Sequence, residues 1–255
     1  MVKIFRKIRQ NLLSEGKTGN YLKYAIGEII LVVIGILIAL QINIWNQSNK
    51  DDKALMEYLV KIKSQTQEDL IVIDSLMVYR KDTAKNCKIA RDRILDKTED
   101  ENLFILMSCG GAFFDYYFKA NDGGYEALKS SGYYGKINNT LLDSLLSKYH
   151  RIVDEISQNE KSYNQYVEAQ EAYISNEFDR SLVMAFAFVP QDSLKLKATS
   201  QAEYFKDFET YTALIPYRNV ISLAAFQFDI MISQYEQLEA SGERVIEEIN
   251  YFLDD

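Results

Sequence analysis

One long apolar stretch dominates the pattern of hydrophobic and polar positions near the start of the chain. It runs from Ala25 to Ile44, and its central part, Ile29 to Leu40, contains no polar side chain. Twenty helical residues span roughly 30 Å, the thickness of a bilayer's hydrocarbon layer. The stretch exceeds a usual signal-peptide core, and no small-x-small cleavage pattern follows it. We therefore predict an uncleaved transmembrane helix over residues 24–45.

Charged and aromatic residues around this stretch indicate its orientation. Six basic residues precede it, with Glu15 as the single acid: Lys3, Arg6, Lys7, Arg9, Lys17 and Lys23. Positively charged segments stay on the cytoplasmic side, and the rings of Tyr24 and Trp45 suit the two membrane interfaces. We expect residues 1–23 to be a cytoplasmic tail and residues 46–255 to be extracytoplasmic.

Apolar positions then recur in steps of three and four residues along three stretches. The first seam is Leu55, Leu59, Ile62, Thr66, Asp69, Ile73, Leu76, Arg80, Thr83, Cys87, Ala90 and Ile94. The second is Leu142, Leu145, Tyr149, Ile152, Ile156, Asn159, Tyr163, Tyr166, Gln170 and Tyr173, and the third is Ile221, Ala224, Phe228, Met231, Tyr235, Leu238, Gly242, Val245, Ile249 and Phe252. Such seams predict long helices that cross at about 20 degrees. The predicted fold class is all-α: one transmembrane helix followed by an elongated antiparallel bundle.

Local signals mark several helix ends. The patterns Thr140-x-x-Asp143 and Ser200-x-x-Glu203 resemble capping boxes, and Pro216 suits the first turn of a helix. The single strand-like alternation, from Leu182 to Val189, is short. We interpret it as an apolar plug flanked by loops.

Residues 109–135 depart from the helical pattern, because they contain six of the eleven glycines and many aromatic residues. We predict a turn region here, with two interpretations. Tyr116, Tyr117, Tyr125 and Tyr133 could line a site for a ligand or partner, or two short helices could turn so that their rings cap one end of the bundle. The glycines do not form a phosphate-binding loop pattern.

The sequence lacks the residue patterns of common enzymes. His150 is the single histidine, so no histidine cluster can hold zinc. Neither a Gly-x-Ser-x-Gly motif nor the Glu-x-x-His motif of di-iron bundles is present. We therefore expect no enzyme activity, and we predict no catalytic, cofactor-binding or metal-binding residue.

The two cysteines leave a choice open. Cys87 and Cys109 could form a disulfide in an oxidising compartment, or each could be a separately buried thiol.

A stripe on the predicted transmembrane helix could mediate helix association. At 100 degrees per residue, Glu28, Gly35 and Ala39 lie within about 40 degrees of one another. The Gly35-x-x-x-Ala39 pair would let another helix approach closely, and Glu28 would prefer a protein neighbour to lipid. Alternatively, Glu28 reaches the cytoplasmic interface, and the two small residues have no special role.

Charge is distributed unevenly along the chain. Residues 1–50 carry a net charge of +5, and residues 51–255 carry −13. An acidic extracytoplasmic part cannot displace the counterions of nucleic acids, so we exclude nucleic-acid binding.

The run from Tyr24 to Asn43, followed by Trp45-Asn46, resembles the signature of an uncharacterised membrane-anchored family of Gram-negative bacteria. Residues 5–9, 125–132 and 141–149 also resemble that family, whereas Ile44 stands where members often carry asparagine. The resemblance implies a single-pass inner-membrane protein with a helical periplasmic part, and it implies no catalytic residues.

Three functional classes follow from these observations. We favour a non-enzymatic scaffold or subunit whose periplasmic bundle binds another envelope protein or a second copy of itself. The alternative is a periplasmic sensor or binding module for a small ligand, which would act through a partner. The third is an enzyme of unfamiliar type. In the first two classes the lipid bilayer is also a partner.

Overall fold

The computed structural model describes residues 18–96, 103–188 and 201–254, and it is helical throughout apart from turns and one extended segment. In chain order its elements are α2 (Thr18–Asp96), α3 (Leu103–Ser108), the short 3₁₀ helix η1 (Cys109–Phe113), α4 (Gly123–Ser130), η2 (Tyr134–Lys136), α5 (Leu141–Glu177), α6 (Ser181–Phe188), α7 (Gln201–Ala213) and α8 (Ile215–Asp254). No described residue lies in a β-strand. The predicted all-α class is therefore confirmed.

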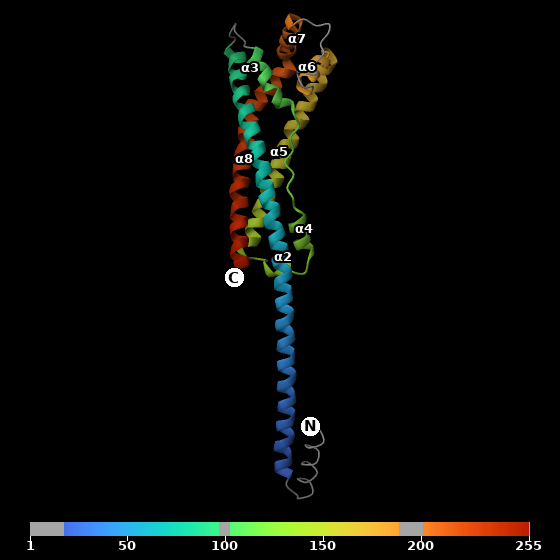
Figure 1. Ribbon diagram of the computed structural model, residues 1–255, viewed down its shortest axis with the longest axis vertical. Coiled ribbons are helices and arrows are strands. Elements are labelled where there is room, and N and C mark those ends of the chain that lie inside the picture. The colour runs from blue at the N-terminus through green and yellow to red at the C-terminus, as the bar shows by residue number, and fades with distance from the viewer. Residues whose placement is uncertain (1–17, 97–102, 189–200, 255) are drawn as a thin grey trace. The chain divides into compact units, whose positions relative to one another are not determined.

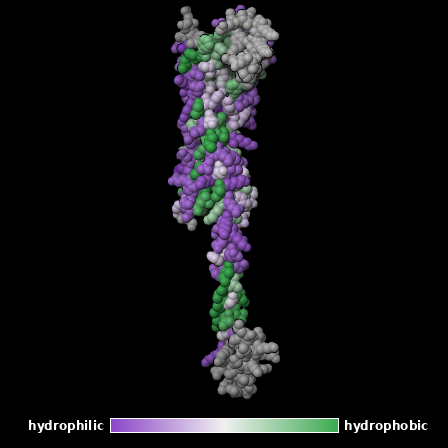
Figure 2. Space-filling model, viewed as in Figure 1, coloured by the Kyte–Doolittle hydropathy of each residue, from purple (hydrophilic) through white to green (hydrophobic). Residues whose placement is uncertain are grey.

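The chain divides into two compact units, residues 1–57 and residues 58–255. The first contains the N-terminal part of α2, where the described chain has its one helical stretch long and apolar enough to cross a membrane. The large apolar side chains from Ile26 to Ile44 are each 47–71% exposed. Figure 2 shows them as a hydrophobic band on the helix. Water alone does not stabilise a continuous apolar surface of this kind.

In the second unit, three long helical segments lie side by side: α2 from Tyr58 onward, α5 and α8 (Figure 1). Helices α5 and α8 contact each other extensively. Ion pairs join α2 to α8, with 3.0 Å between Lys81 Nζ and Glu236 Oε1 and 2.7 Å between Lys88 Nζ and Asp229 Oδ1. Packing of these three segments forms the core.

The predicted first and third seams match buried faces of α2 and α8. Every position of the first seam from Leu59 to Ala90 is buried, and so is every position of the third from Ile221 to Ile249. Hydrophobic periodicity therefore identified which face of each of these helices is turned inward.

The second predicted seam matches the buried face of α5 only in its first part. Tyr166 and Tyr173 are exposed, whereas Val167 and Ile174 are buried in their place. An α-helix has 3.6 residues per turn, so a strict seven-residue pattern rotates by about 20 degrees per heptad away from a fixed face. Beyond Tyr163, which is itself buried, the buried face of α5 has moved by one position.

Most of the predicted helix ends are present. The side chain of Thr140 caps α5, because its oxygen accepts a hydrogen bond from the Asp143 N–H at 3.3 Å. The Asp143 carboxylate accepts in return from the N–H of Asn139, at 3.1 Å, rather than from that of Thr140. Pro216 is the second residue of α8. Ser200, the first residue of the other predicted box, lies outside the described residues.

The apolar stretch that we interpreted as a plug between loops is a helix, so that interpretation is wrong. Residues Ser181–Phe188 form α6, and Val189 lies outside the described residues. The Asp179 carboxylate accepts hydrogen bonds from the N–H and the hydroxyl of Ser181, at 2.9 and 2.6 Å. A carboxylate that satisfies a free amide at a helix start favours helix over strand there.

The glycine-rich and aromatic region forms η1, α4, η2 and an extended stretch, residues 114–122, which we call the extended segment. Two of its glycines permit close approach to α2. A Cβ atom at Gly111 would lie 2.6 Å from the hydroxyl oxygen of Tyr79, and one at Gly124 would lie 2.5 Å from Oε1 of Gln65. Glycine at these positions lets the backbone lie against α2.

Candidate functional site

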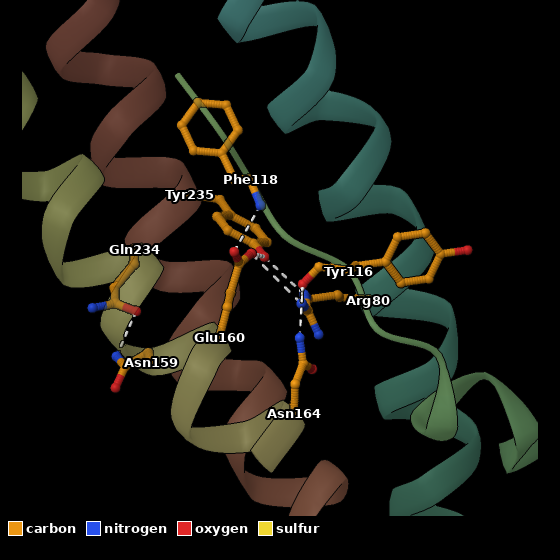
Figure 3. Close-up of polar contacts among 8 residues, drawn as sticks. All are labelled: Arg80, Tyr116, Phe118, Asn159, Glu160, Asn164, Gln234 and Tyr235. Carbon is orange, nitrogen blue, oxygen red and sulfur yellow. Dashed lines mark hydrogen bonds and ion pairs between the residues drawn. The ribbon is translucent and has the colours of Figure 1, made fainter. Parts of the chain in front are cut away.

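A buried ion pair joins the three long helices of the second unit (Figure 3). Nη2 of Arg80, on α2, lies 3.6 Å from Oε1 of Glu160, on α5, and the two side chains are 1% and 0% exposed. Nε of Arg80 donates a hydrogen bond to the Tyr235 hydroxyl of α8 at 2.8 Å. That hydroxyl donates in turn to Oε1 of Glu160. We call these three side chains the Arg80 cluster.

The Arg80 cluster also binds the extended segment. Oε2 of Glu160 accepts a hydrogen bond from the Phe118 N–H at 2.7 Å. The Tyr116 carbonyl accepts from Nη2 of Arg80 and from Nδ2 of Asn164, both at 3.4 Å. Because the extended segment is outside any helix, its buried backbone groups need such partners. Side chains of α2 and α5 therefore form the hydrogen bonds that backbone groups would form with one another within a helix.

Burial determines the electrostatics of this cluster. Loss of water raises the pKa of Glu160, while the hydrogen bonds from Tyr235 and Phe118 and the charge of Arg80 act against that rise. The Arg80 guanidinium carbon lies 4.8 Å from the centroid of the Phe228 ring, a favourable cation–π distance. Both oxygens of Glu160 already accept hydrogen bonds. The geometry is that of a structural ion pair.

A second buried carboxylate fixes the start of α4. Oδ1 of Asp69 accepts from the Asn121 N–H, and Oδ2 accepts from the Tyr149 hydroxyl, both at 2.9 Å. Oε1 of Gln65 accepts from the Gly124 N–H at 2.7 Å. Burial raises the pKa of Asp69 against these bonds. One turn of α2 therefore anchors the end of the extended segment.

The four tyrosines that we singled out do not share one site. Tyr117 is 52% exposed and Tyr125 is buried. Three of the rings have different ring partners: Tyr79 at 4.5 Å for Tyr116, His150 at 4.0 Å for Tyr125 and Tyr58 at 6.3 Å for Tyr133. These contacts position α4 and the extended segment on the long helices.

The single histidine is a packed residue of α5. The His150 ring stacks on Tyr125 with 13° between the planes, and burial lowers the pKa of His150. Four charged groups also act on it, of which Asp122, Glu126 and Asp154 raise the pKa and Lys129 lowers it. Among the described residues, no three His, Cys, Asp or Glu side chains lie together as a metal site would require.

The two cysteines are neighbours, although no disulfide joins them. Cys87 and Cys109 are both fully buried. A hydrogen bond between the two thiols is the main cause that raises the pKa of Cys87, and burial adds to it. The Cys109 thiol also donates to the Ile105 carbonyl at 3.3 Å. The structure therefore contains two free thiols, as in the second alternative that the sequence left open. The two thiols lie side by side, however, and not apart.

The proposed association stripe lies on exposed helix in the first unit. Gly35 and Ala39 are exposed, Glu28 is half-buried, and a Cβ atom at Gly35 would meet nothing within 4 Å. Association through Glu28, Gly35 and Ala39 stays a prediction.

A cavity of about 470 Å³ lies elsewhere in the second unit, and we call it the aromatic cavity. Its walls come from α3, η1, α5, α6, α7, α8 and the turn before α6. The lining residues include Gly111, Phe113, Glu171, Arg180, Met184, Tyr211 and Tyr217. None of the four predicted tyrosines lines it.

The sequence carried a signal for the ion pair and a partial one for the cavity, because Gly110, Gly111, Phe113 and Phe114 belong to the predicted glycine-rich and aromatic region. Arg80 and Asp69 occupy positions of the first apolar seam, so a charged side chain at an inward position marked each of them. The residues that line the aromatic cavity come from segments far apart in the chain, with no shared spacing.

The comparisons with known proteins identify the family and nothing further. Residues 28–177 match the model of a family of unknown function, DUF6090, and the chain belongs to this family. No curated protein and no solved structure is detectably similar to the chain.

Replacing one partner of the ion pair should strongly destabilise the protein. Arg80→Met leaves Glu160 buried without its countercharge, and we expect it to lower the free energy of unfolding by about 3–5 kcal/mol. The double variant Arg80→Met/Glu160→Leu should recover part of this loss. Urea unfolding of the full chain in detergent, followed by helical circular dichroism, measures both effects.

The neighbouring residue provides the matched control. Lys81 pairs with Glu236 at 3.0 Å, but both side chains are more than half exposed. Lys81→Met should therefore cost at most about 1 kcal/mol. Equal losses for Arg80→Met and Lys81→Met would contradict the role given to the buried pair.

The lowered pKa of His150 predicts a pH effect on stability. A base whose pKa is lower in the folded than in the unfolded protein adds stability above its unfolded pKa, about 6.5, and loses it as the pH falls through the folded value. Asp69 and Glu160, whose pKa values are raised, act in the opposite sense at lower pH. Between pH 7.5 and 5.5, the melting temperature should therefore fall further in the wild type than in His150→Phe, which keeps a ring against Tyr125. The same fall in both proteins would refute this role.

Proposed function

We propose that this member of the DUF6090 family is a membrane-anchored, non-enzymatic scaffold or subunit. Its helical second unit would bind another envelope protein or a second copy of the chain. One observation carries the proposal: a straight row of exposed apolar side chains on the part of α2 that belongs to the second unit. The uneven charge distribution and the apolar band support the same interpretation.

The exposed hydrophobic band between Ile26 and Ile44 supports the membrane anchor. Its side chains are not covered by the described protein, and lipid tails would cover them. Six basic residues precede the band, which favours a cytoplasmic N-terminus. In this proposal the chain spans the bacterial inner membrane once and residues 46–255 are periplasmic.

The row on α2 consists of Val60, Ile71, Val78 and Ile89, and we call it the α2 stripe. These side chains are 53%, 69%, 71% and 39% exposed, respectively. Their spacings of eleven, seven and eleven residues are nearly whole helical turns, so all four lie within about 20 degrees on α2. A second helix could bury all four side chains at once, which is how helices associate.

Buried polar groups support a role without catalysis. The two buried carboxylates, Asp69 and Glu160, each accept hydrogen bonds on both oxygens. The buried thiols of Cys87 and Cys109 are joined by a hydrogen bond. These groups hold helices and the extended segment together, which supports a structural role for them.

The topology can be measured directly. A protease added to intact spheroplasts should remove the large C-terminal part of the chain and leave a short membrane-embedded fragment that contains residues 25–44. The reason is that residues 46–255 are outside the cytoplasm in this proposal. A chain that is fully protected in spheroplasts but cleaved in lysed cells would contradict the proposed orientation.

The association can be tested on the full chain, extracted from native membranes with a mild detergent. Pull-down and native mass spectrometry should recover a homo-oligomer or a partner in fixed stoichiometry. Ile71→Glu/Val78→Glu places two charges on the α2 stripe and should weaken the association at least about tenfold, since burying an unpaired charge costs several kcal/mol.

Two controls locate the interface. Val72→Glu makes the same change at an exposed position of α2, about 120 degrees from Val60, and it should leave the association unchanged. Glu28→Leu and Gly35→Leu test whether the transmembrane stripe contributes. A strictly monomeric wild-type protein without any partner would refute the scaffold proposal.

A further inference from the structure

We propose that the aromatic cavity binds a neutral, mainly apolar small molecule that carries one hydrogen-bond acceptor, of which an aromatic ketone is the simplest type. This site is independent of the α2 stripe and goes beyond the scaffold function. The proposal combines the size of the cavity, the arrangement of its rings and the hydrogen bonds of its polar groups.

The size and the walls of the cavity suit a ligand with one to three rings. Its volume, about 470 Å³, lies within the range of roughly 300–1,000 Å³ typical of small-molecule sites. Phe113 and Tyr217 stack with their ring centroids 5.0 Å apart. Tyr211 meets Tyr217 edge to face at 4.9 Å. Because each ring is held by another, the aromatic wall is present before any ligand enters.

Most polar groups at the walls are already bonded within the protein. The Tyr217 hydroxyl donates to the Leu106 carbonyl at 2.6 Å, and the Thr212 hydroxyl donates to the Phe208 carbonyl at 2.9 Å. Burial raises the pKa of Tyr211 to about 12, so its hydroxyl stays neutral at physiological pH. The wall that these residues offer to a ligand is therefore largely apolar.

Arg180 is a polar residue of the wall with a donor that is not hydrogen-bonded within the described protein. Its Nη2 donates to Glu171, and its Nη1 donates to the Ser175 hydroxyl at 3.3 Å. Its Nε atom is buried and has no acceptor among the described residues, although Arg180 also interacts with the Tyr211 hydroxyl. Because a buried donor without a partner is costly, a ligand atom that accepts from Nε would be strongly favoured. The charge of Arg180 is balanced by Glu171, so an anionic ligand would meet a carboxylate beside its binding group. These facts favour a neutral acceptor over a carboxylate.

The cavity also has flexible residues in its walls. Met184, on α6, is 36% exposed, and Met107, on α3, is half-buried. Methionine side chains adapt to ligands of different shape. They also lie where a light-activated probe in the cavity would react.

Benzophenone is a suitable probe, because it has two rings, no charge and one carbonyl acceptor. On irradiation its carbonyl oxygen takes the hydrogen atom of a neighbouring C–H bond, and its carbonyl carbon then bonds to the carbon that lost it, so it needs no second reagent. We expect saturable labelling of peptides that contain Met107 or Met184 when the full chain is irradiated in membranes and analysed by mass spectrometry. Labelling of residues 25–44 by probe dissolved in the bilayer serves as the internal standard.

A competition experiment distinguishes binding through the hydrogen-bond acceptor of the ligand from binding by hydrophobic contact alone. Fluorenone, which keeps the carbonyl, should block the labelling at about one tenth of the concentration that diphenylmethane requires, since a hydrogen bond from a charged donor is worth about a factor of ten or more. The anionic probe 4-benzoylbenzoate should label the cavity less than benzophenone does. Equal competition by the two compounds, or equal labelling by the two probes, would overturn the proposal.

A conservative substitution tests Arg180 itself. Arg180→Lys keeps the positive charge and removes the Nε donor, and it should weaken labelling about tenfold. Arg151→Lys is the matched control, because Arg151 lies on the surface of α5 and pairs with Glu155 at 3.2 Å. Melting curves establish whether both variants fold. If Arg180→Lys does not fold, the competition experiment decides alone. Unsaturable labelling spread over the second unit would refute a specific site.

Discussion

The buried contact between Arg80 and Glu160 is the interaction on which the arrangement of the second unit depends. Apolar seams repeat along each helix, so they would tolerate a shift of one helix against another by whole turns. A buried charge does not, because any shift would leave it without its countercharge and without water. One register of α2, α5 and α8 brings the guanidinium, the carboxylate and the Tyr235 hydroxyl together. The ion pair therefore selects among packings that the apolar residues alone would accept.

The same contact shapes the region next to it. Glu160 and Arg80 hold the middle of the extended segment at Phe118 and Tyr116. Before this segment, the Tyr79 hydroxyl donates to the Gly111 carbonyl at 2.8 Å. The backbone is thus fixed on α2 at η1, where Phe113 reaches the Tyr217 ring of α8. A structural ion pair in the core and one wall of the aromatic cavity are consequently parts of one continuous set of contacts.

The distribution of polar and apolar groups indicates what kind of function this fold supports. Inside, the buried carboxylates and thiols are used to join helices, and each carboxylate oxygen already accepts a hydrogen bond. Outside, the exposed apolar side chains of the described residues include the band from Ile26 to Ile44 and the α2 stripe. Such a molecule is suited to contact lipid, other proteins and small apolar ligands. This physical division underlies the proposal of an anchored scaffold that also carries a ligand cavity.

The sequence by itself determined the all-α class, the apolar band, the inward faces of α2 and α8 and the Thr140 cap, since each depends on residues a few positions apart. It misplaced the inward face of α5 beyond Tyr163 and did not predict the helix α6, because small deviations from a repeat and a single capping carboxylate determine these features. Charged residues within the first seam marked Arg80 and Asp69, but not their partners. Only the tertiary structure paired Arg80 with Glu160, set Cys87 beside Cys109 and assembled the aromatic cavity, because contacts between distant segments depend on how whole helices pack.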